Sequence, residues 1–272
     1  MASQLKSSSS EVDSTVELQT SDDERRHGPD GGGRPDLARF EAVLLDVGNV
    51  ILYDFPVELA YSYFVSREIA HRQLGLAPNA FEILRASNDP TELACKLGGT
   101  RLWEVINALA WEQVLDNWAA LCVPIPGALE SLQSLSHLRL AIVANQPSAT
   151  MKVLERLGID KLFSEIIFDS TAGVSKPDEG IYRYAARRLR ARPESLIMIG
   201  DRLDNDILPA QAVGIRTAWV KQVPLDENLP MPHVSNSWRS HYFRLKRAAT
   251  LYRLSGSARP DYVLERLSDL CP

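Results

Sequence analysis

The sequence contains few residues that could form disulfides or bind zinc. Its three cysteines are odd in number, widely spaced and without a CxxC pair, so they predict neither a disulfide framework nor a zinc site. The five histidines are scattered and form no HxxxH pair, and each is expected to be structural or exposed rather than a metal ligand. A reducing, cytoplasmic compartment is the expectation that fits this composition.

The signals of membrane and nucleic-acid-binding proteins are also missing. No apolar run is long enough for a transmembrane segment, and no internal repeat, GxGxxG or Walker pattern is present. The first residues are not expected to act as a signal peptide, because they have no apolar core. The formal net charge is −5, which argues against nucleic acid as the main partner, because phosphate backbones are held by clustered Lys and Arg. With 45% hydrophobic and 24% charged residues over 272 positions, the chain is typical of a globular protein with a core domain and one smaller unit.

Residues 1–38 contain almost nothing apolar to bury. They carry a serine run, six acidic residues between Glu11 and Glu24, and three consecutive glycines. This composition predicts a disordered tail.

An apolar run at residues 42–54 is interrupted by the carboxylate of Asp46. Its β-branched residues and lack of polar alternation predict a strand buried on both faces, in the middle of a parallel sheet. Gly48 and Asn49 end this strand, so Asp46 is expected at its carboxyl end, where open α/β sheets bind their ligands. Considered alone, Asp46 could equally well cap the following turn.

Residues 55–121 are expected to form four helices with no strand between them. Prolines are expected to open the first two, and Thr100 to cap the fourth, which should run to about Ala120. The inward face of the fourth helix is expected to include Leu102, Val105, Ile106 and Leu109. Core packing, rather than a binding stripe, is the favoured role of Trp103, Trp111 and Trp118.

From residue 122 onward, short apolar runs alternate with helical patterns. Strands are expected at 138–143, 165–169, 196–199 and 216–220. Such βα alternation implies a parallel sheet covered by helices. Segments 39–54 and 122–272 are therefore assigned to an α/β core, and 55–121 to an inserted helical unit.

Polar side chains follow the expected strands at their carboxyl ends. Asn145 ends one strand, Asp201 and Asp206 follow another, and Lys176 lies in a loop before a helix. Carboxylate oxygens that converge on one crevice suit Mg²⁺, and a lysine beside them can neutralise the charge of a phosphate. Taken singly, Lys176 could be a solvated loop residue and Asp204 a helix cap.

Four of these segments carry a joint pattern, in which h is an apolar residue. They are hhhhDxxxxh around Asp46, the turn at Ala144-Asn145, the segment Lys176-Pro177-Asp178, and GDxxxxD from Gly200 to Asp206. Together they resemble the motifs of the haloacid dehalogenase-like (HAD) hydrolase superfamily, over residues 40–270. The resemblance implies a Rossmann-like core with a helical cap at residues 55–121.

The same resemblance implies a phosphatase that works through an aspartyl-phosphate on Asp46. Lys176 would stabilise the charge on Asp46 and on the transferred phosphoryl group. The expected ligands of Mg²⁺ are Asp46, the backbone carbonyl of Gly48, Asp201 and Asp206. Contacts with a small phosphorylated substrate are expected at Asn145, Gly48 and Asn49, with the cap closing over it.

Two positions depart from the usual phosphatase pattern. Gly48 stands where most of these phosphatases have a second Asp, the general acid and base, and Ala144 stands where they have a Ser or Thr that binds a phosphoryl oxygen. Without an acid at position 48, the rate is expected to depend steeply on leaving-group pKa, unless the substrate, a cap residue or a water supplies the proton. A Gly48→Asp variant is expected to cleave alkyl phosphates faster if the pocket has room.

Three functions therefore stay open. A Mg²⁺-dependent phosphatase is favoured. A metal-free dehalogenase-type hydrolase would not need the pair Asp201 and Asp206, which this chain keeps. A catalytically degraded domain would bind a phosphorylated ligand or a protein partner without turnover.

Residues 237–254 lie in an insertion, 221–258, between the strand expected at 216–220 and a further strand expected at 262–264. A helical face is shared by Trp238, Tyr242, Leu245, Ala249 and Tyr252, and it is surrounded by Arg239, Arg244, Lys246, Arg247 and Arg253. We expect a packed amphipathic helix. Binding of an acidic partner or a membrane surface is the less favoured alternative.

Overall fold

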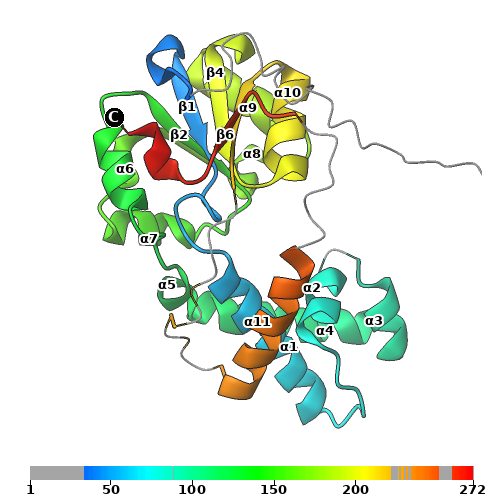
Figure 1. The fold of residues 1–272 in the computed structure, drawn as a ribbon. Helices are drawn as coiled ribbons and strands as arrows, with labels where there is room; N and C mark the ends of the chain where they lie inside the picture. The colour runs from blue at the N-terminus through cyan, green and yellow to red at the C-terminus, as the bar shows by residue number, and fades with distance from the viewer. Residues whose placement is uncertain are drawn as a thin grey trace, which may run out of the picture.

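The computed structural model describes residues 34–87, 89–221, 226, 228–229, 231, 234–250 and 259–271, and only the backbone of 247–250. The described residues form two lobes, a helix-covered sheet and a group of helices (Figure 1). The predicted class, an α/β parallel-sheet core with inserted helices, is confirmed.

The sheet has six strands in the order β3-β2-β1-β4-β5-β6, and every neighbouring pair is parallel. The strands are β1 (Ala42–Leu45), β2 (Leu140–Ala144), β3 (Phe163–Phe168), β4 (Leu196–Gly200), β5 (Arg216–Val220) and β6 (Tyr262–Leu264). At the centre, Leu45 of β1 pairs with Ile142 of β2 and with Ile199 of β4. All four residues of β1 are buried, as the apolar run predicted.

Helices cover both faces of the sheet because side chains alternate between the faces of each strand. Val43 and Leu45 join the apolar cluster that includes residues of α6 (Ala128–Ser134) and α7 (Thr150–Arg156). Leu44 joins the opposite cluster, with residues of α9 (Gly180–Leu189) and α10 (Leu208–Val213). The short helix α8 (Asp169–Ala172) follows β3.

The second half of the apolar run, residues 47–53, forms a buried turn instead of extending β1. The backbone N–H groups of Ile51 and Leu52 both donate to the carbonyl of Val47 at 2.9 Å. The turn then pairs with the chain that returns from the helical lobe, since Tyr53 N donates to Val123 O at 2.9 Å. The two segments that join the lobes therefore lie side by side.

The helical lobe contains α1 (Phe55–His71), α2 (Ala80–Ala86), α3 (Thr91–Lys96), α4 (Thr100–Asp116) and α5 (Trp118–Leu121). The predicted fourth helix is therefore shorter than expected, because the chain breaks at Asn117 and restarts as α5. Its buried residues are Trp103, Ile106, Ala110 and Val114. The inward orientation expected for Val105 is wrong, because this residue lies off that helical stripe and is 45% exposed. Trp118 is also buried, as expected, and Trp111 is partly buried.

The insertion after β5 supplies α11 (Asn236–Thr250), which packs on α1 and α2 of the helical lobe (Figure 1). The Phe243 ring lies 5.5 Å from that of Phe55, and Trp238 Nε1 donates to Ser62 Oγ at 3.2 Å. This helix was expected within the core segment 122–272, but its apolar face packs against α1 of the helical lobe.

The amphipathic packing predicted for α11 is thereby confirmed for residues 236–246, and residues 251–254 lie outside the described part of the chain. Glu58 of α1 accepts hydrogen bonds from the Tyr242 hydroxyl and from Lys246 Nζ. Lys246 therefore forms an ion pair with Glu58 inside the helical lobe, although it was predicted to be one of the basic residues around the apolar face. An acidic partner for this helix stays a prediction.

The boundary expected for the disordered tail is wrong at residues 34–38. Leu37 begins a 3-10 turn, Leu37–Arg39, and packs into the core with 6% of its surface exposed. Asp36 caps this turn by accepting a hydrogen bond from Ala38 N at 3.2 Å. Residues 1–33 lie outside the described part of the chain. Among the helices that are described, none is both long and apolar enough to cross a membrane.

Candidate active site

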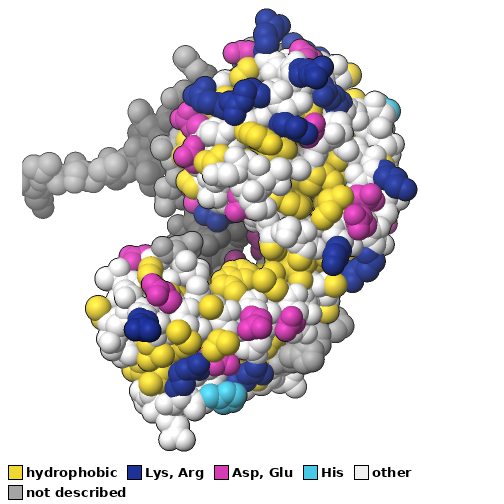
Figure 2. Space-filling model, turned by 180° about the vertical axis from the view of Figure 1, so that it is seen from behind, with side chains coloured by type: hydrophobic (Ala, Val, Ile, Leu, Met, Phe, Trp, Pro, Cys, Tyr) yellow, Lys and Arg dark blue, Asp and Glu magenta, His cyan; other side chains and the backbone are white. Residues whose placement is uncertain are grey.

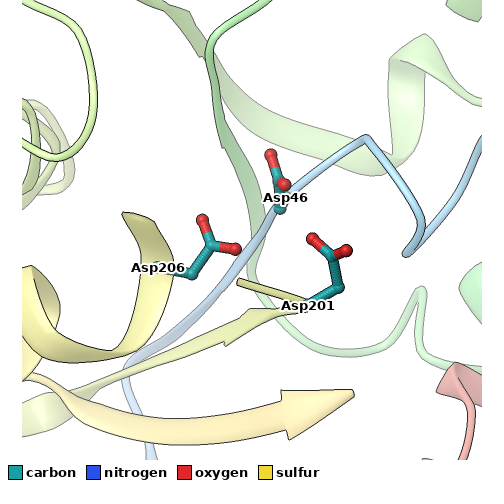
Figure 3. Close-up of side chains that lie close together, drawn as sticks. All are labelled: Asp46, Asp201 and Asp206. Atoms are coloured by element: carbon teal, nitrogen blue, oxygen red, sulfur yellow. The ribbon is translucent and has the colours of Figure 1, made fainter. Parts of the chain in front are cut away.

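Three aspartates meet at the carboxyl ends of the central strands. Asp46 follows β1, Asp201 follows β4, and Asp206 lies in the turn after Asp201. Asp201 and Asp206 lie on opposite sides of Asp46 (Figure 3). A carboxylate oxygen from each lies within 4.8 Å of the others, and all three residues are buried. Because the strands are parallel, residues far apart in the sequence reach the same edge of the sheet.

Lys176 completes this cluster from the loop between α8 and α9. Its Nζ donates to Oδ1 of Asp46 at 2.7 Å and to Oδ1 of Asp206 at 2.6 Å. Asn145 holds the loop in place, because its amide donates to the carbonyl of Lys176 at 2.9 Å and accepts from the N–H of Lys176 at 2.8 Å. The sequence predicted a substrate contact for Asn145, and did not reveal this supporting role.

The turn after β4 directs Asp206 toward Asp46. It is a single π-helical turn, η5 (Leu203–Ile207), in which Arg202 N donates to Oδ2 of Asp206 at 2.9 Å. A Cβ atom on Gly200 would lie 2.5 Å from that same oxygen, so glycine is required there. Asp204 lies outside the cluster and pairs with Arg202 at the surface.

The carboxylates carry more negative charge than the single ammonium offsets. Burial raises the pKa of Asp46 to about 6 against the charge of Lys176, and Asp206 adds to the rise. Burial also raises the pKa of Asp201 well above its usual value, with the charges of Asp54 and Asp206 adding to it. Burial lowers the pKa of Lys176, but the charges of Asp206 and Asp46 outweigh it, so the pKa lies above the usual value and the side chain is an ammonium.

The residues present fit a hard divalent cation. Oδ2 of Asp201 accepts from Asn49 Nδ2 at 3.1 Å, whereas its buried Oδ1 has no hydrogen-bond partner among the described residues. A buried carboxylate oxygen without a donor is costly unless a cation binds it. Three buried carboxylates supply the oxygen ligands that Mg²⁺ prefers.

The turn at Gly48 and Asn49 brings a further carboxylate to the site. Asn49 adopts a left-handed backbone conformation, with φ of 51°, and its Nδ2 also donates to Oδ2 of Asp54 at 3.2 Å. Its Oδ1 accepts from Asp54 N at 3.2 Å. Burial raises the pKa of Asp54 to about 7, and the charges of Asp46 and Glu58 add to the rise. Asp54 was not among the predicted site residues, although it is the second carboxylate in the otherwise apolar run at residues 42–54.

A cavity of about 210 Å³ lies beside the cluster. Its wall includes Asp54, Glu58, Trp111, Trp118, Asn145 and Gln146. Seen from behind, the surface is hollowed between the two lobes, and hydrophobic side chains gather along this waist (Figure 2). The site is therefore bounded by the sheet on one side and by α1, α4 and α5 of the helical lobe on the other.

The turn after β2 supplies polar groups although Ala144 has no hydroxyl. Thr150 Oγ1 donates to Oε1 of Gln146 at 3.2 Å and accepts from Trp118 Nε1 at 3.1 Å. This chain of hydrogen bonds orients the Gln146 amide at the cavity wall. No sequence pattern indicated a role for Gln146, because a lone glutamine after a strand is common in turns.

The sequence matches the family model of haloacid dehalogenase-like hydrolases over residues 65–220. The chain belongs to this family. It is 33% identical over 178 residues to a glyceraldehyde 3-phosphate phosphatase of Pyrococcus furiosus, a match covering 64% of this chain and 70% of that protein. It is 31% identical over 112 residues to the pyrimidine 5′-nucleotidase YjjG of Escherichia coli, covering 40% of this chain and only 50% of that relative.

Solved structures share the fold. A HAD phosphatase from Thermococcus onnurineus superimposes with a TM-score of 0.56 at 21% identity, over 85% of this chain and 95% of that one. An L-2-haloacid dehalogenase from Xanthobacter autotrophicus superimposes with a TM-score of 0.52 at 17% identity, over 85% and 96%. At these identities the likeness shows the fold alone and does not separate phosphatase from dehalogenase chemistry.

Proposed function

We propose that this protein is a Mg²⁺-dependent phosphatase that acts on a small phosphorylated metabolite through an aspartyl-phosphate on Asp46. The observation that carries the proposal is the buried group in which Asp46 shares Lys176 with Asp206, 4.8 Å or less from Asp201. A nucleophilic carboxylate, a fixed ammonium and a set of oxygen ligands are the parts that phosphoryl transfer from a monoester requires.

Each residue has a distinct part in this reaction. Asp46 attacks the phosphorus, and Lys176 offsets the charge of Asp46 and of the transferred phosphoryl oxygens. Asp46, the carbonyl of Gly48, Asp201 and Asp206 would hold Mg²⁺, which supplies positive charge to the phosphoryl group. Asn145 fixes the loop of Lys176 through its two backbone bonds.

The substrate is proposed to be a small phosphate monoester. Both named relatives act on such esters, a triose phosphate in one and a nucleotide in the other. The cavity of about 210 Å³ is small, and its tryptophans give the leaving group an apolar wall. A cytoplasmic location stays a prediction from the cysteine content.

Two alternatives differ from this proposal in what they require. A dehalogenase-type hydrolase would use Asp46 without a metal. The buried Oδ1 of Asp201 would then have neither a cation nor a hydrogen-bond donor among the described residues. A degraded domain would bind a ligand without turnover, as the losses at Gly48 and Ala144 suggest.

One screen separates the three functions. Phosphate release from a panel of phosphorylated metabolites is measured with Mg²⁺ and with EDTA, for the wild type and for Asp46→Asn. The proposal expects release that needs both Mg²⁺ and Asp46. Release of halide from a haloacid in EDTA would favour the dehalogenase, and binding of a phosphorylated compound without release would favour the degraded domain.

A further inference from the structure

The reaction needs a proton for the departing oxygen, and position 48 carries no acid. In the structure the space beside Gly48 is filled by another carboxylate. A Cβ atom built on Gly48 would lie 2.5 Å from Oδ2 of Asp54 and even closer to Oδ1. The Asp54 carboxylate therefore occupies the volume into which a side chain at position 48 would project.

Asp54 does not have the role that its place in the chain would suggest. It is the N-cap residue of α1, where an aspartate usually accepts a hydrogen bond from the first turn, yet its side chain makes no capping bond. The carboxylate instead turns toward the site and binds Asn49, whose Nδ2 also donates to Asp201. The missing capping bond costs about 1 kcal/mol of stability, so the carboxylate is expected to have another role in the site.

The other side of Asp54 faces the cavity. The residue is partly buried and lines the cavity together with Trp111, Asn145 and Gln146. Within the described part of the chain, only Oδ2 of its carboxylate accepts a hydrogen bond, which leaves Oδ1 for a ligand. A leaving group must lie on the far side of the phosphorus from Asp46, toward the helical lobe, where Asp54 begins α1.

We propose that Asp54 is the proton donor for the leaving oxygen, in place of an acid at position 48. The proposal rests on the phosphatase function proposed above. As the oxygen of Asp46 bonds to phosphorus and the ester P–O bond breaks, the proton of the Asp54 carboxyl moves to the leaving oxygen, which departs as an alcohol. In the second step a water oxygen attacks the phosphorus, Asp54 takes its proton, and the bond from phosphorus to Asp46 breaks to release phosphate.

This assignment changes two expectations drawn from the sequence. The wild-type rate should depend only weakly on leaving-group pKa, because the departing oxygen is protonated. The single change Gly48→Asp should impair the enzyme, because its side chain would overlap the Asp54 carboxylate.

The test is a series of phosphate esters with graded leaving groups, from 2,4-dinitrophenyl through phenyl to ethyl phosphate. Wild type, Asp54→Asn and Asp54→Ala are compared. The loss in Asp54→Asn should reach about 10²- to 10⁴-fold for ethyl phosphate and become small for the dinitrophenyl ester, which needs no proton. A Mg²⁺-induced rise in Tm shows that each variant is folded.

A double variant returns the carboxylate to position 48. Because Asp54→Ala empties the space beside Gly48, the double variant Gly48→Asp/Asp54→Ala should cleave ethyl phosphate faster than Asp54→Ala alone. A loss of equal size for every ester, or no loss at all, would overturn the proton-donor role while leaving the phosphatase function intact. If the wild type releases phosphate from none of the esters, the phosphatase function itself fails.

Discussion

The Nζ atom of Lys176 lies 2.7 Å from Oδ1 of Asp46, although 130 residues separate the two in the chain. The same ammonium donates to Oδ1 of Asp206 at 2.6 Å. Both pairs are buried, so removal of the lysine would leave two carboxylates without their cation. The lysine therefore contributes to the stability of the site as well as to its chemistry.

Replacing Lys176 should destabilise the protein. In the absence of metal and at about pH 8, Lys176→Met should lower the free energy of unfolding by about 3–5 kcal/mol, because buried charges lose their partner. Urea titration measures this effect. The matched control is Lys221→Met, whose exposed pair with Glu265 should be worth about 0–1 kcal/mol. Similar small losses in both variants would contradict a buried, shared ammonium.

Mg²⁺ should stabilise the folded protein through Asp201. At a concentration near 100 times its Kd, a ligand of the native state adds about 2.7 kcal/mol, which a thermal shift detects. Asp201→Ala should remove this response. Asp204→Ala should keep it, since Asp204 belongs to the same turn but lies at the surface. A thermal shift that survives Asp201→Ala would remove the assigned metal site.

The affinity for Mg²⁺ should rise with pH. The raised pKa values of Asp46, at about 6, and of Asp201 mean that both carboxyls take up protons above the usual range of aspartate. Protons therefore compete with the metal below about pH 7. For each proton that Mg²⁺ must displace, the affinity for Mg²⁺ should fall by up to about tenfold per unit decrease in pH. Titration calorimetry between about pH 5 and 8 measures the slope. A constant Kd across this window would contradict metal binding by these carboxyls.

Docking of α11 should contribute to the stability of the helical lobe. Phe243 is buried against Phe55, so Phe243→Ala should cost about 3–5 kcal/mol through the lost contacts and the cavity left behind. The neighbouring control is Arg244→Ala, because Arg244 is exposed. Equal Tm values for the two variants would show that the helix does not depend on this packing, and the proposal of an external partner would gain.

The sequence predicted the sheet and the position of the acidic site because both follow from local patterns. A run of buried β-branched residues ended by Gly48 and Asn49 identifies the central strand, and Asp46 lies where that strand ends. Asp201 and Lys176 follow the same logic, since ligands of parallel sheets gather at one edge.

Other features depend on contacts that no local pattern encodes. The helix α11 docks on α1 through Phe55, about 190 residues earlier in the chain, and its own amphipathic pattern gives no information on that partner. Asp54 has the residue type and place of a helix cap, and only the structure shows that its carboxylate instead fills the space beside Gly48.

Trapping the covalent intermediate tests the central role of Asp46 most directly. Wild-type enzyme with Mg²⁺ is mixed with 2,4-dinitrophenyl phosphate, quenched rapidly in acid and analysed by peptide mass spectrometry. One phosphoryl group should appear on Asp46, and Asp46→Asn should carry none and release no phosphate. Release of phosphate by Asp46→Asn at the wild-type rate, or a phosphoryl group on another residue, would contradict this role.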